Sequence, residues 1–116
     1  MSDRAVYSPH MVALADIQSL ADRIARLFQP ERIILFGSHA YGQPRESSDV
    51  DLLLIMEHEG SALDMDVRIW SATRPPFSAD FIIRRPADTA RRYREFDPLI
   101  REAVDKGKVL YDRRSS

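Results

Sequence analysis

The sequence contains no cysteine, so it can form neither a disulfide nor a thiolate metal site. It also shows no excess of charge, because 17 basic residues stand against 18 acidic ones. This balance argues against general binding to duplex nucleic acid, since proteins of that class are usually basic. No apolar run is long enough to span a membrane, and the N-terminus lacks the basic start and apolar stretch of a signal peptide. We therefore expect a cytoplasmic protein.

The length and the apolar content suit one small domain. Hydrophobic residues make up 44% of the 116 residues, which is enough for one core and not for two. We expect a single domain over residues 1–116.

The apolar pattern predicts four strands and several helices. Strands are predicted at Arg32–Phe36, Val50–Met56 and Ala79–Arg84, with a short final strand at Val109–Tyr111. Helices are predicted from Ser8–Pro9 to Pro30, over 39–41 with Ser38 as cap, over 61–72 with Ser61 as cap, from Pro86 to about Tyr93, and from Pro98 to Asp105 with Gly107 as a left-handed cap. Alternating apolar residues would also permit a strand at 61–72. This order predicts an α+β fold, a small mixed β-sheet packed with helices.

A Gly-Ser turn follows the first predicted strand. Gly37 would let the backbone approach a triphosphate closely, and Ser38 with the amides after it would bind phosphate oxygens at a helix start. An ordinary strand-to-helix turn capped by serine is the alternative. The two acidic residues that follow this turn in the chain favour the phosphate-binding interpretation.

Two aspartates, Asp49 and Asp51, open the second predicted strand. Side chains two residues apart on a strand project from the same face, so these carboxylates would lie together. Hard oxygen ligands favour Mg²⁺ or Mn²⁺ over zinc, and no cysteine or histidine cluster competes with them. A turn cap at Asp49 and an ion pair at Asp51 are the structural alternative.

The Gly-Ser turn followed by the D-x-D pair resembles the nucleotidyltransferase superfamily that includes polymerase beta. The smallest members, the minimal nucleotidyltransferases or MNT proteins, are the most similar. The resemblance extends from Phe28-x-Pro-x-x-Ile-x-Leu-Phe-Gly-Ser to the closing Gly107-x-Val-Leu-Tyr111. It implies the polymerase-beta-like nucleotidyltransferase fold, with Gly37 and Ser38 binding the nucleotide.

The same resemblance implies a site for Mg²⁺ and ATP. In the family, a third carboxylate on a neighbouring strand completes a two-metal site, and Asp80 matches it by its place on the third predicted strand. Asp49, Asp51 and Asp80 would then be both catalytic and metal-binding. An exposed acid on an edge strand is the alternative for Asp80. His39 and Tyr41 stand where the family often has arginine, which would weaken triphosphate binding.

The resemblance also implies a function. Many MNT proteins are antitoxins paired with a HEPN-type RNase toxin, and some transfer AMP from ATP to a tyrosine of that toxin. A helical domain that brings the acceptor in larger family members is not expected in 116 residues, so a partner would supply it. Two rival functions are neutralisation of a toxin by binding alone and transfer to a small molecule. The sequence does not decide whether the protein forms homo- or hetero-oligomers.

Other charged and apolar groups carry weaker signals. If 61–72 is helical, Asp64 and Asp66 diverge and are solvated surface acids. His39 is expected to be solvated. The arginines between Arg84 and Arg94 are either a solvated helix face or a contact surface, and the candidate partner surface adds three apolar residues, Phe96, Leu99 and Ile100.

Overall fold

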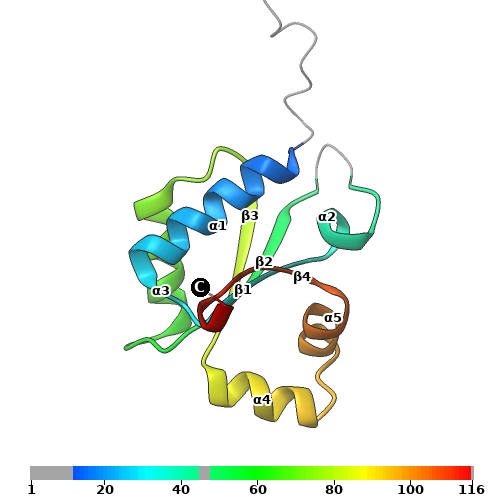
Figure 1. Ribbon diagram of the computed structural model, residues 1–116. Coiled ribbons are helices and arrows are strands. Elements are labelled where there is room, and N and C mark those ends of the chain that lie inside the picture. The colour runs from blue at the N-terminus through cyan, green and yellow to red at the C-terminus, as the bar shows by residue number, and fades with distance from the viewer. Residues whose placement is uncertain (1–11, 45–47, 116) are drawn as a thin grey trace, which may run out of the picture.

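A four-stranded mixed sheet is the centre of the molecule. The computed structural model describes residues 12–44 and 48–115, and Figure 1 shows the arrangement of its elements. The strands are β1 (Arg32–Phe36), β2 (Val50–Ile55), β3 (Ala79–Arg84) and β4 (Lys108–Asp112), in the spatial order β3-β2-β1-β4. β1 is antiparallel to β2 and β4, whereas β2 and β3 are parallel. The predicted mixed sheet and α+β class are confirmed.

Helices cover both faces of this sheet. They are α1 (Leu14–Phe28), α2 (Ser38–Tyr41), α3 (Ala62–Thr73), α4 (Pro86–Arg94) and α5 (Pro98–Lys106), followed by the short 3₁₀ helix η2 (Arg113–Ser115). α3 links the parallel strands β2 and β3, which a hairpin could not do. The helix predicted at 61–72 is confirmed, and the Ser61 side chain accepts a hydrogen bond from the Asp64 amide at 3.0 Å.

Two apolar layers hold the helices in place. On one face, α1 and α3 pack on the sheet through residues such as Leu20, Ile24 and Ile69, all at most 1% exposed. On the other face, Ile100 and Ala103 of α5 pack on alternate residues of β1 and β2. Figure 1 shows α1 and α3 on one side of the sheet and α4 with α5 on the other. Within the described residues, no helix has the length and apolar character needed to cross a membrane.

Four details differ from the sequence predictions. The helix start predicted at Ser8–Pro9 lies outside the described residues, and within them the first helix begins at Leu14. No side chain caps α2, because its N-cap is Gly37 and Ser38 is already its first helical residue. Ile100 is 1% exposed and therefore belongs to the core, not to a partner surface.

The fourth difference concerns Gly107, which is not a left-handed cap. Its φ of −72° and ψ of 170° are extended backbone that any residue adopts. Crowding excludes a side chain instead, since a Cβ there would lie 2.3 Å from the Ala103 carbonyl oxygen and 2.5 Å from Ile34 Cγ2. The glycine therefore permits the close approach of the end of α5 to β1.

Candidate active site

Gly37 turns the chain from β1 into α2 at the edge of a group of acids. Its φ is +78°, a left-handed conformation that favours glycine. A Cβ at this position would lie 2.3 Å from Asp51 Oδ2. Glycine is therefore required here for two reasons: its backbone angle, and the Asp51 carboxylate that lies against it. The short helix α2 begins immediately afterwards, with the Ala40 amide bonded to the Gly37 carbonyl at 3.0 Å.

Asp51 and Asp80 lie side by side in the sheet. They are register partners between the parallel strands β2 and β3, and Phe36 of β1 is the next residue in the same row. Because side chains alternate along a strand, this row shares the face that α5 covers through Leu53. β3 is an edge strand and Asp80 is exposed. The structure thus brings together two of the three predicted carboxylates.

Electrostatic repulsion is concentrated at Asp51. Burial raises the pKa of its carboxyl above the ordinary value, and the charges of Asp80, Asp49 and Glu102 raise it further, while His39 lowers it. Nearby negative charges disfavour the ionised form of the Asp51 carboxyl. A cation would relieve the repulsion, so the row is a candidate binding site.

Asp49 lies just before β2, as the structural alternative for this residue supposed. Its Oδ1 accepts a hydrogen bond from the Ser78 hydroxyl at 2.5 Å, and its backbone oxygen accepts one from Nδ1 of His39 at 3.1 Å. His39 is half-buried rather than fully solvated, in contrast to the sequence prediction. Ser78, which the sequence did not single out, therefore fixes the direction of the Asp49 carboxylate.

Tyr41 and Glu102 complete the side of the site next to α5. The Tyr41 hydroxyl donates a hydrogen bond to Glu102 Oε2. Burial raises the pKa of Tyr41, the bond to Glu102 adds to the increase, and Asp51 contributes a smaller part. Local sequence pattern gives no sign of Glu102, because only the packing of α5 on β1 carries it to α2.

Asp66 is a further acid near this group, and it is partly buried rather than the fully solvated surface acid that the sequence predicts. Burial raises its pKa, and the charge of Asp80 raises it further. α3 buries Ile69 and Thr73, three and seven residues later, so Asp66 lies at the border of the buried face. Its sequence partner Asp64 is exposed, and the predicted divergence of the two is confirmed.

The donor chemistry of the acidic group fits a hard divalent cation. Carboxylate oxygens are the ligands that Mg²⁺ prefers. Among the described residues, however, no three histidine, aspartate or glutamate side chains are arranged so that they could hold a metal ion together. The bond from Ser78 occupies Oδ1 of Asp49 and leaves its Oδ2 available to a ligand.

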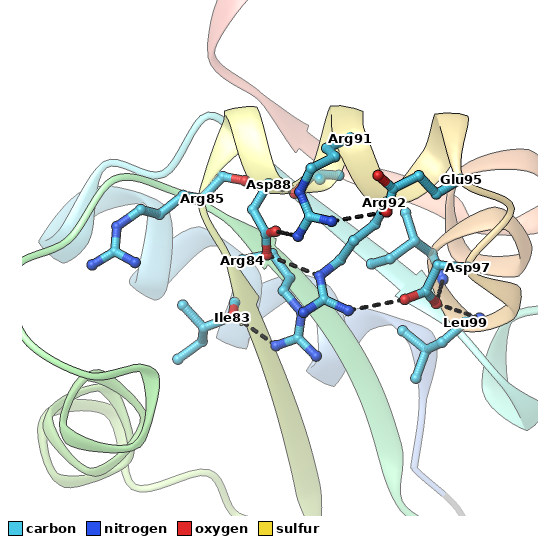
Figure 2. Close-up of polar contacts among 11 residues, drawn as sticks. Ile83, Arg84, Arg85, Asp88, Arg91, Arg92, Glu95, Asp97 and Leu99 are labelled. Atoms are coloured by element: carbon cyan, nitrogen blue, oxygen red, sulfur yellow. Dashed lines mark hydrogen bonds and ion pairs between the residues drawn. The ribbon is translucent and has the colours of Figure 1, made fainter.

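The arginines of β3 and α4 lie at the other end of the same sheet face, and Arg91 and Arg92 are already paired with carboxylates. Figure 2 shows Arg91 between Asp88 and Glu95, at 2.5 and 2.8 Å, and Arg92 between Asp88 and Asp97, at 2.9 and 3.0 Å. Charge reversal at Arg91 or Arg92 would therefore break intramolecular contacts before it tested a partner surface. The cluster acts chiefly within the fold.

A cavity of about 360 Å³ lies at this arginine end, away from the acids. It is lined by residues of α4 and by Arg32 and Ile55, which pair with each other at the far ends of β1 and β2. The cavity therefore belongs to the opposite end of the sheet from Asp51.

Comparisons with known proteins identify the family and support the fold. The family model for the polymerase beta nucleotidyltransferase domain matches residues 18–116. No curated protein shows a significant match. Among solved structures, a candidate nucleotidyltransferase of Sulfolobus solfataricus aligns with a TM-score of 0.59 and 18% identity, over 93% of this chain and 87% of its own. A chain of a toxin–antitoxin solved with AMP-PNP aligns with a TM-score of 0.56 and 20% identity, over 84% of this chain and 75% of its own.

The fold and the acidic row define a nucleotidyltransferase-type domain. The chain belongs to the polymerase beta nucleotidyltransferase family. At identities of 18% and 20%, the two solved structures show the shared fold alone.

Proposed function

We propose that this protein is a Mg²⁺-dependent antitoxin that transfers AMP from ATP to a tyrosine hydroxyl of a HEPN-type toxin. The observation that carries the proposal is the row in which Asp51 and Asp80 lie side by side, with Asp51 against Gly37. Support for the toxin comes from the structural neighbour, which is itself a toxin–antitoxin solved with AMP-PNP. We place the reaction in the cytoplasm.

Each group in the site has a separate task in this proposal. Gly37 and Ser38 bring backbone amides to the triphosphate at the start of α2, where no side chain occupies the cap. Asp49, Asp51 and Asp80 would hold Mg²⁺, which would neutralise charge on the phosphates. Asp80, the exposed acid of the pair, takes the proton from the attacking hydroxyl.

Positioning accounts for much of the expected rate. In-line attack at the α-phosphorus needs the acceptor held against it, and such positioning is worth about 7–11 kcal/mol in favourable cases. The partner toxin would supply the acceptor hydroxyl and part of this positioning. The edge location of β3 leaves Asp80 open to such a partner.

A second function is neutralisation of the toxin by binding alone. The observation in its favour is that the carboxylates of the described residues do not form a ready three-ligand metal group. If the protein neutralises the toxin by binding alone, variants that lose the carboxylates of the acidic row should still neutralise it.

The test compares the wild type with the double variant Asp49→Asn, Asp51→Asn in a growth-rescue assay, together with mass spectrometry of the co-expressed toxin. The proposal expects the toxin to gain AMP mass with the wild type only, and rescue to fail with the variant. Full rescue by the double variant, with no nucleotide on the toxin, would defeat the catalytic function and leave the fold assignment intact. Unchanged binding of ATP and Mg²⁺ by the variant in calorimetry would show that these aspartates are not the metal ligands.

A further inference from the structure

Tyr41 places a hydroxyl nucleophile inside the candidate active site. It is the last residue of α2, one turn after Gly37, whose carbonyl oxygen accepts a bond from the Tyr41 amide at 3.3 Å. The side chain is 43% exposed, so a ligand in the site could reach the phenol oxygen. The residue therefore lies where the proposed triphosphate would bind.

A carboxylate is already bonded to this hydroxyl. Tyr41 donates to Glu102 Oε2, and both side chains lie close enough to Asp51 for their charges to interact with it. A nucleophile that donates a hydrogen bond to a base is the usual arrangement for nucleophilic attack. Because its surroundings keep the phenol protonated, attack by Tyr41 needs such a proton acceptor.

The chain offers a second tyrosine–carboxylate pair for comparison. The Tyr93 hydroxyl donates to Asp105 Oδ1 at 2.7 Å. Tyr93 lines the cavity at the arginine end of the sheet, away from Asp51 and Asp80. A hydrogen bond between phenol and carboxylate is thus not special in this fold, and the position of Tyr41 beside the acidic row is what distinguishes it.

We propose that Tyr41 is itself an acceptor of the nucleotidyl group, with Glu102 as the base that takes its proton. The inference rests on the proposed nucleotidyltransferase function and adds a self-modification to it. The Tyr41 oxygen forms a bond to the α-phosphorus of ATP while the bond from that phosphorus to the bridging oxygen breaks. Pyrophosphate leaves, and the phenolic proton passes to the Glu102 carboxylate.

The experiment incubates the purified full chain with ATP and Mg²⁺ and follows its intact mass, with peptide mapping of the product. The wild type should gain one adenylyl group on Tyr41. Tyr41→Phe should lower this self-modification at least about 100-fold, since the acceptor oxygen is gone. Tyr93→Phe is the matched control, because it removes an equivalent phenol–carboxylate bond, and it should modify itself at the wild-type rate.

The base role of Glu102 has its own readout. Glu102→Gln keeps a hydrogen-bond acceptor for Tyr41 but cannot take a proton, so self-modification should fall roughly 100-fold. Its affinity for ATP with Mg²⁺, measured by calorimetry, should stay equal or become tighter, because a negative charge beside the phosphates is lost. A parallel loss of affinity and rate would instead make Glu102 a nucleotide-binding residue and overturn its assignment as base.

The outcomes separate this inference from the proposed function. A wild type that modifies its toxin but stays unmodified, or that carries the adenylyl group on another residue, overturns the self-modification alone. A wild type that binds no ATP and modifies nothing overturns both. Thermal unfolding of Tyr41→Phe checks that the variant is folded, and peptide mapping of both variants checks that no other residue carries the adenylyl group in place of Tyr41.

Discussion

The strands β2 and β3 carry carboxylates at one end of a sheet face and lie beside arginines at the other. At the first end, Asp51 and Asp80 are neighbours, and neither forms an ion pair within the described residues. At the second end, where Ile55 pairs with Arg84, the arginines Arg91 and Arg92 of α4 are bonded to three carboxylates. Figure 2 shows this second network, in which the Asp88 carboxylate accepts hydrogen bonds from both Arg91 and Arg92.

The difference lies in how each end satisfies its charges. At the arginine end, Arg91 and Arg92 are paired with carboxylates of the same chain, so these two charges contribute to the fold. At the acidic end, burial raises the pKa of Asp51, and the charges of Asp80 and Asp49 raise it further. Uncompensated charge in a partly buried place costs stability and is typical of sites whose ligand supplies the opposite charge. Substitutions at the two ends should therefore affect different properties.

The largest effect is expected for Asp80→Asn at the acidic end. Asparagine has nearly the same shape but cannot accept the proton of the attacking hydroxyl, so transfer should fall by at least about 100-fold. Much of the ATP binding should remain, because Asp49 and Asp51 are unchanged. Radiolabel transfer from ATP to the toxin measures the rate, and calorimetry measures the binding.

A matched control for that variant is Asp64→Asn, which makes the same chemical change at an exposed position of α3. It should transfer AMP at the wild-type rate. If Asp80→Asn also does so, Asp80 is a surface acid of an edge strand and the third carboxylate lies elsewhere.

A smaller effect, on stability, is expected for Asp88→Asn at the arginine end. This variant weakens the bonds that Asp88 Oδ1 and Oδ2 make to Arg91 and Arg92. Exposed ion pairs are individually weak, so the Tm should fall by roughly 2–4 °C. Transfer and ATP binding should not change, because the network lies at the opposite end of the sheet face from Asp51.

Differential scanning fluorimetry checks this result, with Glu59→Gln as a control at an exposed loop position. An unchanged Tm for Asp88→Asn would show that the α4 network contributes nothing measurable. A loss of ATP binding would show that the two ends are not independent.

The sequence predicted the acidic end better than it predicted its surroundings. Gly37, Asp49 and Asp51 belong to a short local pattern, and the parallel register places Asp80 beside Asp51. Glu102 could not be predicted, because it reaches Tyr41 only through the packing of α5 on the sheet. That contact depends on tertiary structure, which local spacing does not encode.

The remaining errors have similar causes. The partial burial of Asp66 and its proximity to Asp80 do not follow from the sequence, because a helix pattern gives the direction of a side chain but not which strand lies next to it. The glycine at 107 was correctly expected at a helix end, yet its cause is crowding against Ile34 and not a left-handed backbone. The strands and helices themselves follow from apolar spacing, proline and glycine, and their bounds agree within about two residues where the structure describes them.

The smallest expected effect is on the pH dependence of folding stability, which should have opposite signs at the two ends. Hydrogen bonds from Arg92 to Asp88, and from the Ile100 amide to Asp97, lower the pKa of these carboxyls below the unfolded value of 3.8. Their stabilisation is therefore complete above pH 3.8 and is lost as the pH falls through the folded values. Asp51 has the opposite sign, because its raised pKa means that ionisation destabilises the folded state. As the pH falls from neutral toward 3.8, protonation of Asp51 removes that cost.

In metal-free buffer with a chelator, the Tm should thus rise slightly on mild acidification and fall below about pH 3.8. Asp51→Asn should remove the rise and keep the fall, whereas Asp88→Asn should reduce the fall and keep the rise. The rise and the fall in Tm each amount to a few degrees at most, since the groups are only partly buried. A rise that persists in Asp51→Asn would assign it to another acid of the cluster, with Asp66 next to be tested because its pKa is also raised.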